Sequence, residues 1–137
     1  MSEPVDTNVL LRYLMEDASS IPERFRGVFS FFRKLERGER TAFLPSLVVF
    51  QTYFVLTSYY EVPRPEAAQK LADLLGMRGL KVPDRRILRR CLSILRDGTT
   101  NLVDAYLAAL CQSRGQAGVF SFDTGLEALG LELLPVE

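Results

Sequence analysis

The sequence predicts an α/β fold in three layers, with helices on both faces of a central, mostly parallel sheet of roughly four to five strands. Short apolar runs alternate along the chain with longer segments of helical periodicity, which is typical of strand–helix units. The elements follow one another without a linker, an internal repeat or a low-complexity tract. A length of 137 residues suits one domain. We therefore expect residues 1–137 to form a single domain.

Residues 3–6 predict a short first strand, and two helices follow it. The first helix has an apolar face at helical spacing: Val9, Leu10, Tyr13 and Leu14. The second follows Ser20, has Pro22 in its first turn, where proline is favoured, and ends at Gly38. Its apolar stripe has the same spacing: Phe25, Val28, Phe29, Phe32 and Leu35. The chain thus opens with the expected change from strand to helix.

Residues 41–44 predict the second strand, and residues 47–59 predict the helix that follows it. Ser46 is placed to cap this helix. The helix is apolar on most sides, so we expect it to be buried, and its valines leave a strand as the alternative. Two prolines then interrupt the chain before a helix that ends at Gly76. Its apolar face is made of residues at helical spacing: Ala67, Ala68, Leu71, Leu74 and Leu75.

The rest of the chain predicts two more helices and three more strands. Asp84 is expected to cap a helix with a strong apolar stripe, and the next helix begins near Thr100 or Asn101. Both cysteines, Cys91 and Cys111, fall on the apolar faces of these helices, so we expect buried thiols. Three short apolar runs predict the strands: residues 80–82, 118–122 and 131–135.

Composition excludes several classes of function. The chain contains no histidine, which excludes Ser-His-Asp and Cys-His catalysis and the usual structural zinc sites. Residues 1–4 do not open a signal peptide, and apolar runs such as residues 47–50 are far too short to span a membrane. With two cysteines and no signal sequence, we expect a cytoplasmic protein with no membrane partner.

Charge gives no general attraction to nucleic acid, because 17 basic residues balance 17 acidic ones. Any contact with nucleic acid must therefore come from a local patch or from metal ions. Basic residues gather on the second helix and on the helix after Asp84: Arg24, Arg26, Arg33, Lys34, Arg37 and Arg40, then Arg85, Arg86, Arg89, Arg90 and Arg96. Solvated helix faces are the simpler interpretation, and a track for an RNA backbone or a protein contact is the alternative.

Three aspartates stand where strands end or helices begin. Asp6 ends the first strand, Asp123 ends a later strand, and Asp104 lies in the first turn of a helix. Ligands of open α/β sheets bind outside the carboxyl ends of the strands, so these carboxylates are candidates for one acidic site. Each also has a simpler interpretation, as a helix cap, a first-turn acid or a turn residue.

Four strings of the sequence resemble one family in the same order. They are VDTNVLLRYL at residues 5–14, LVVFQTYFVL at 47–56, NLVDAYLAA at 101–109 and FSFD at 120–123. Together they resemble PIN domains, particularly the VapC-type toxins. The resemblance implies an endoribonuclease that depends on Mg²⁺ or Mn²⁺, is neutralised by a small antitoxin protein and forms a homodimer.

The same resemblance implies roles for single residues. Asp6, Asp104 and Asp123 would be the catalytic metal ligands, directly or through water. Asn8 would orient Asp6, and Ser121, where the family has threonine, would form a hydrogen bond nearby. Such a site suits hard cations, which prefer oxygen ligands.

Two positions depart from the family. Gln51 stands where the family has glutamate, and Asn101 stands where many members have aspartate. An amide oxygen can bind a cation but cannot act as a base, so we expect weaker metal binding. The simpler interpretations are a buried amide at Gln51, paired with Asn8 or a backbone group, and a helix cap at Asn101.

These departures leave two functions open: an active ribonuclease, or a PIN domain that has lost catalysis and binds RNA or protein. A receiver domain would also be a doubly wound α/β fold of this size. It needs a lysine late in the chain, whereas the last lysine here is Lys81, and the early acids do not pair as a receiver requires.

Overall fold

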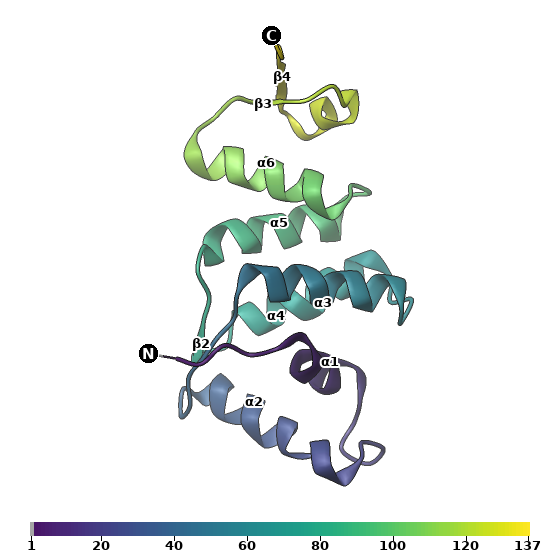
Figure 1. The fold of residues 1–137 in the computed structure, drawn as a ribbon, viewed down its shortest axis with the longest axis vertical. Helices are drawn as coiled ribbons and strands as arrows, with labels where there is room; N and C mark the ends of the chain where they lie inside the picture. The colour runs from purple at the N-terminus through teal and green to yellow at the C-terminus, as the bar shows by residue number, and fades with distance from the viewer. Residues whose placement is uncertain (1) are drawn as a thin grey trace. The chain divides into compact units, whose positions relative to one another are not determined.

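The computed structural model describes residues 2–137, so Met1 of the amino-terminal segment considered above lies outside the described residues. The chain divides into two compact units, Met1–Pro83 and Asp84–Glu137, and each is described by itself. Helices and short parallel strands occur in both units (Figure 1). The α/β class that the sequence predicts is therefore confirmed.

The strands of the first unit pair in parallel around residues 42–43. β1 (Ala42–Phe43) pairs with β2 (Leu80–Lys81). Pro4 forms a parallel bridge with Phe43 on the other side, where the Val5 amide donates to the Phe43 carbonyl at 2.9 Å. The strands expected at residues 3–6, 41–44 and 80–82 are thus present, in shorter form.

Two helices follow the Pro4 segment. α1 (Thr7–Met15) leads to a 3₁₀ turn, η1 (Glu23–Phe25), and then to α2 (Gly27–Arg37). The second helix therefore begins later than Pro22 suggested. It ends at Gly38, whose φ of 76° is a left-handed conformation that suits glycine. Tyr13 of α1 stacks on Phe32 of α2 with ring centroids 4.2 Å apart, which ties the two helices together.

α3 (Ser46–Ser58) is a helix, so the strand alternative is wrong. Ser46 is its first residue and Pro45 holds the cap position, so the expected serine cap is also wrong. One side of α3 is buried: Val49, Thr52, Tyr53 and Leu56. The opposite side leaves Leu47 79% and Phe54 60% exposed. Burial on most sides was therefore a wrong expectation for this helix, which packs against α1 and α4.

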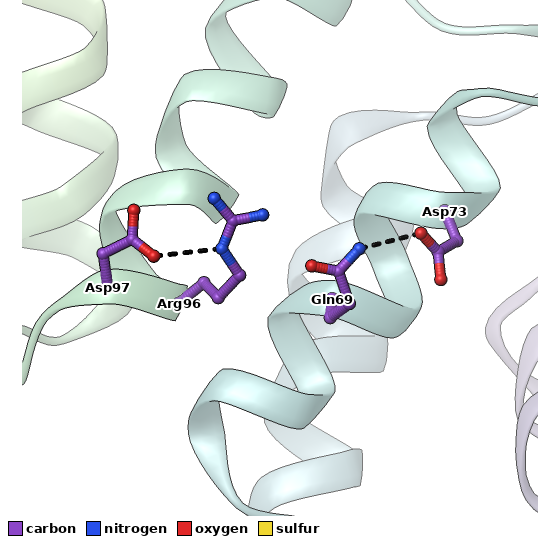
Figure 2. Close-up of polar contacts among 4 residues, drawn as sticks. All are labelled: Gln69, Asp73, Arg96 and Asp97. Atoms are coloured by element: carbon purple, nitrogen blue, oxygen red, sulfur yellow. Dashed lines mark hydrogen bonds and ion pairs between the residues drawn. The ribbon is translucent and has the colours of Figure 1, made fainter.

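α4 (Arg64–Leu75) lies beside α3 (Figure 1) and is capped at its end by Gly76, as expected. All five residues of its predicted apolar face are buried: Ala67, Ala68, Leu71, Leu74 and Leu75. On the exposed side, the Gln69 amide donates to Asp73 at 2.8 Å, one turn further on (Figure 2). The apolar spacing thus predicted both the helix and its inner face.

The second unit begins with a helical hairpin, α5 (Arg85–Asp97) and α6 (Leu102–Arg114), whose helices pack side by side (Figure 1). Asp84 holds the cap position of α5 but has a left-handed φ of 54°, and its side chain caps nothing. Its expected capping bond is therefore wrong. Both cysteines are buried free thiols, as predicted, and burial raises the pKa of Cys91 to about 12.

β3 (Gly118–Phe120) and β4 (Glu132–Leu134) pair in parallel, joined by a 3₁₀ segment, η2 (Thr124–Leu129). Gly118 faces the Glu132 backbone so closely that a Cβ would collide with it. A small core lies under this pair: Ala108, Cys111, Leu126 and Leu131. Along residues 2–137, four strands and the Pro4 bridge supply the short parallel segments that the sequence predicts. No described helix has the length and apolar character of a membrane span.

Candidate functional site

Asp6 lies where the first parallel segment ends and α1 begins. It is the N-cap of α1, and its Oδ1 accepts a hydrogen bond from the Thr7 amide at 2.7 Å. The simpler interpretation as a cap is therefore correct, and it does not exclude a site. The side chain is exposed, and no described group forms a hydrogen bond with Oδ2. One carboxylate oxygen is thus fixed while the other is open to a ligand.

A cavity of about 760 Å³ opens beside Asp6 and Asn8, within the first unit. α1, η1, α2 and residues 40–42 surround it. The structure brings Asn8 and Asp6 to this one cavity without a hydrogen bond between them in the described part of the chain. The cavity also gathers side chains that sequence reasoning did not join: Arg12, Arg24, Phe25, Phe31 and Arg40. The cluster of basic residues on the second helix was the available signal.

Gln51 is exposed on α3, so the interpretation as a buried amide is wrong. It lines a shallow hollow of about 490 Å³, to which Thr7 of α1 also contributes. Because Thr7 directly follows Asp6, the amide of Gln51 lies in the neighbourhood of the N-terminus of α1. The hollow is otherwise apolar, being completed by Leu47, Val48, Phe50 and Phe54.

Asp104 and Asn101 form a pair at the start of α6. Asn101 is the N-cap: its Oδ1 accepts from the Asp104 amide at 2.9 Å, and its Nδ2 donates to Asp104 Oδ2 at 3.1 Å. The expected helix cap at Asn101 is confirmed. The amide also does what an aspartate there could not, since it donates a hydrogen bond that holds the half-buried Asp104 carboxylate.

Asp123 follows β3 and is the N-cap of η2. Its Oδ1 accepts from the Gly125 amide at 2.9 Å, and its own amide donates to Ser121 Oγ at 2.9 Å. Ser121 therefore fixes the backbone that carries Asp123. Phe120 and Phe122 alongside are 74% and 84% exposed. The turn interpretation of Asp123 holds, and no described group forms a hydrogen bond with its second carboxylate oxygen.

The donor chemistry of these residues fits a hard divalent cation. Asp6, Asp104 and Asp123 each engage one oxygen in a local hydrogen bond and are negative groups at a helix start. Asp6 belongs to the first unit, and Asp104 and Asp123 belong to the second. Along residues 2–137, no three cysteine, aspartate or glutamate side chains are already gathered as a metal site.

Comparison with protein families identifies the chain. The PIN domain model matches residues 5–131, a range that includes all three aspartates and Gln51. Comparisons with curated proteins and with solved structures found no match. PIN domains are in general nucleases that use divalent metal ions. Since the match spans nearly the whole sequence, this chain belongs to the PIN domain family.

Proposed function

We propose that this PIN domain is an endoribonuclease that depends on Mg²⁺ or Mn²⁺, works in the cytoplasm and is the toxin of a toxin–antitoxin pair. The family supports metal-dependent nuclease activity. The finer assignment rests on the resemblance of residues 5–14, 47–56, 101–109 and 120–123 to VapC-type toxins. By the same resemblance we propose a homodimer, which analytical ultracentrifugation tests.

The observation that carries the proposal is the shared setting of the three aspartates. Asp6 follows the Pro4 bridge and Asp123 follows β3, and each of the three lies at the cap or in the first turn of a helix. The carboxyl edge of parallel strands is where α/β folds bind ligands. We therefore assign Asp6, Asp104 and Asp123 as the metal ligands of one site. In this proposal residues 1–137 form one domain.

In this proposal the protein's own groups hold the carboxylates ready. The Thr7 amide, the Asn101 side chain and the Gly125 amide each occupy one carboxylate oxygen. Each bond restricts the rotation of its aspartate, so little freedom remains to be lost on binding. The ion, when bound, supplies charge that stabilises the scissile phosphate and activates a water. Ser121 fixes the backbone that carries Asp123, and Asn8 lines the cavity beside Asp6.

Gln51 decides how strong the activity is. Its exposed amide adjoins the start of α1, where the family has a carboxylate. A neutral oxygen contributes less to cation binding than a charged one and accepts no proton from water. We therefore expect a weak nuclease with a high requirement for metal.

RNA cleavage tests the proposal. Purified protein is incubated with labelled single-stranded RNA and Mg²⁺ or Mn²⁺, and products are resolved by denaturing electrophoresis. Wild type should cut, Asp6→Asn should lose at least about a hundredfold in rate, and Gln51→Glu should cut faster. Asp73→Asn is the matched control, because Asp73 is an exposed carboxylate of α4 that pairs with Gln69. Cleavage that persists in Asp6→Asn would remove Asp6 from the site.

A PIN domain that has lost catalysis is the second candidate. Gln51 favours it, as does the apolar surface around it on α3, where Leu47 and Phe54 are exposed. An exposed apolar face of this kind suits contact with another protein. If only Gln51→Glu cuts RNA, the natural chain is of this kind and its role is binding.

A further inference from the structure

The cavity beside Asp6 combines apolar residues with a cluster of charged side chains. Its volume of about 760 Å³ is within the range of small-molecule sites, roughly 300–1,000 Å³. Three arginines line it, Arg12, Arg24 and Arg40, against two carboxylates, Glu3 and Asp6. The 3₁₀ turn η1 carries Arg24 and Phe25, both of which line the cavity.

Two of the three arginines keep their charge available. Arg12 pairs with Glu16 at 2.6 Å, one turn along α1. Arg24 and Arg40 are exposed, and no described carboxylate forms an ion pair with either. With Arg12 paired, Arg24 and Arg40 balance the lining carboxylates of Glu3 and Asp6, so a cation bound at Asp6 would leave the lining positive. The cavity is therefore complementary to an anion that approaches Asp6.

Each of the three arginines also lies over a phenyl ring. The Arg12 guanidinium lies 3.8 Å from the centroid of Phe25, and that of Arg24 lies 4.6 Å from the same ring. Arg40 lies 5.1 Å from the centroid of Phe31. A guanidinium held over a ring is planar, so it offers a face on which a nucleic-acid base stacks, together with edge N–H groups for phosphate. The combination favours a ligand with both flat rings and phosphates.

We propose that this cavity is an RNA subsite, which holds about one or two nucleotides of single-stranded substrate beside Asp6. The inference rests on the proposed ribonuclease function, whose site it adjoins. Arg24 and Arg40 contact the phosphates, and the guanidinium–phenyl stacks on Phe25 and Phe31 receive the bases. The cavity selects single strands, because only unpaired bases expose their faces for stacking.

Binding without catalysis tests the subsite separately from the nuclease. Anisotropy of a fluorescein-labelled single-stranded RNA is measured with EDTA present, so that no metal-dependent cleavage occurs. Arg24→Ala and Arg40→Ala should each weaken binding by roughly tenfold and lower the slope of log K against log salt by about one. Arg24→Lys keeps the charge and loses the planar stack, so it should keep the salt slope and still bind more weakly. Arg33→Ala, an exposed arginine of α2 outside the cavity lining, is the control and should bind like wild type.

Stacking gives a second readout. An RNA that carries 2-aminopurine should lose fluorescence on binding to wild type and lose less on binding to Phe31→Leu. Phe31 is only half buried, and circular dichroism verifies that the variant folds.

The outcomes separate the two proposals. RNA that binds through Arg24 and Arg40 but is never cut supports the subsite and removes the ribonuclease proposal. RNA that is cut, with Arg24→Ala and Arg40→Ala binding like Arg33→Ala, overturns the subsite and leaves the ribonuclease. Unchanged RNA binding combined with capture of an acidic peptide by the same arginines also overturns it, because the cavity would then belong to a protein partner.

Discussion

Arginines gather in two regions of this chain, and the structure uses them differently. Around the cavity of the first unit, Arg12, Arg24 and Arg40 lie over phenyl rings and beside Asp6. On the α5–α6 hairpin, Arg90 donates to Gln112 at 2.7 Å and Arg96 pairs with its neighbour Asp97 at 3.0 Å (Figure 2). These last two arginines are exposed and serve local contacts, as a solvated helix face does.

The difference shows that a run of basic residues in a sequence does not by itself indicate a binding site. Both clusters look alike in sequence, since each gathers arginines on or beside helices. What distinguishes them is the aromatic ring beneath the guanidinium and the cavity beside it, which hold a cation where a ligand can reach it. A cluster of charged residues becomes a candidate binding site only where the fold places it beside a cavity.

The largest predicted effect is on the free energy of unfolding and comes from the buried face of α5, opposite its arginines. Leu88 is fully buried, and Leu88→Ala should lower the free energy of unfolding by about 2–5 kcal/mol, because it removes transfer energy and leaves a cavity. Arg86→Ala, on the exposed face of the same helix, should change it by less than about 0.5 kcal/mol. Urea unfolding followed by circular dichroism measures both. Equal effects would contradict the view that α5 serves the fold through its apolar face.

Gln51→Glu should sharpen the comparison of the two arginine regions, because it restores a carboxylate near the cavity of the first unit. We expect the metal concentration for half-maximal cleavage to fall by roughly tenfold. Gln112→Glu, beside Arg90 in the second region, is the matched control and should leave that concentration unchanged. A metal titration of the cleavage rate gives the answer, and an unchanged midpoint in Gln51→Glu would place residue 51 outside the site.

Arg24→Ala should raise the KM for RNA by about tenfold and leave kcat within about twofold, since the subsite binds substrate away from the reacting phosphate. Arg86→Ala should alter neither constant. Steady-state cleavage kinetics provide the measurement. A fall in kcat with KM unchanged would mean that Arg24 acts on the transition state, and the subsite would need a different description.

The pH response of Cys91 should show that it lies on the buried face of α5. Burial raises the pKa of this thiol from an ordinary value of 9.0 to about 12. Its stabilising contribution is therefore complete below pH 9 and is lost as pH rises toward 12, because the unfolded thiol ionises first. At pH 8, iodoacetamide should label Cys91 in urea far faster than in the native protein, as mass spectrometry will detect. Rapid native labelling would contradict its burial.

The smallest effect should come from Arg90→Ala. Its bond to Gln112 is exposed, so its loss should cost about 0.5 kcal/mol or less. Chemical unfolding of Arg90→Ala and Gln112→Ala, singly and together, measures the coupling. A cost above about 1 kcal/mol would mean that this pair helps to hold the hairpin together.

Local patterns predicted what local physics determines. The face of α4, the cap at Asn101 and the glycine stop at Gly38 follow from spacing and capping alone, and the structure confirms them. α3 has no such pattern, since apolar residues occur on every side. Which side is buried depends on α1 and α4, so neither the exposure of Phe54 nor that of Gln51 could be predicted.

In the candidate site, too, the local features could be predicted and those that depend on tertiary packing could not. The sequence could indicate Asp6, Asp104 and Asp123 because each stands at a strand end or helix start, and the hydrogen bonds that hold them are local. The cavity could not be predicted, because it needs the 3₁₀ turn that carries Arg24 and Phe25. The sequence suggested instead a helix from Pro22, in which this turn has no place.

The most direct test of the central claim is whether three aspartates bind one metal ion. Mn²⁺ is titrated into wild type, Asp6→Asn, Asp104→Asn and Asp123→Asn, and bound ion is followed by the loss of the free Mn²⁺ signal in electron paramagnetic resonance. Each substitution should weaken binding by at least about tenfold, with Asp73→Asn unchanged. If wild type binds Mn²⁺ and any one of the three variants binds it equally well, that aspartate is not a ligand and the proposed site is wrong.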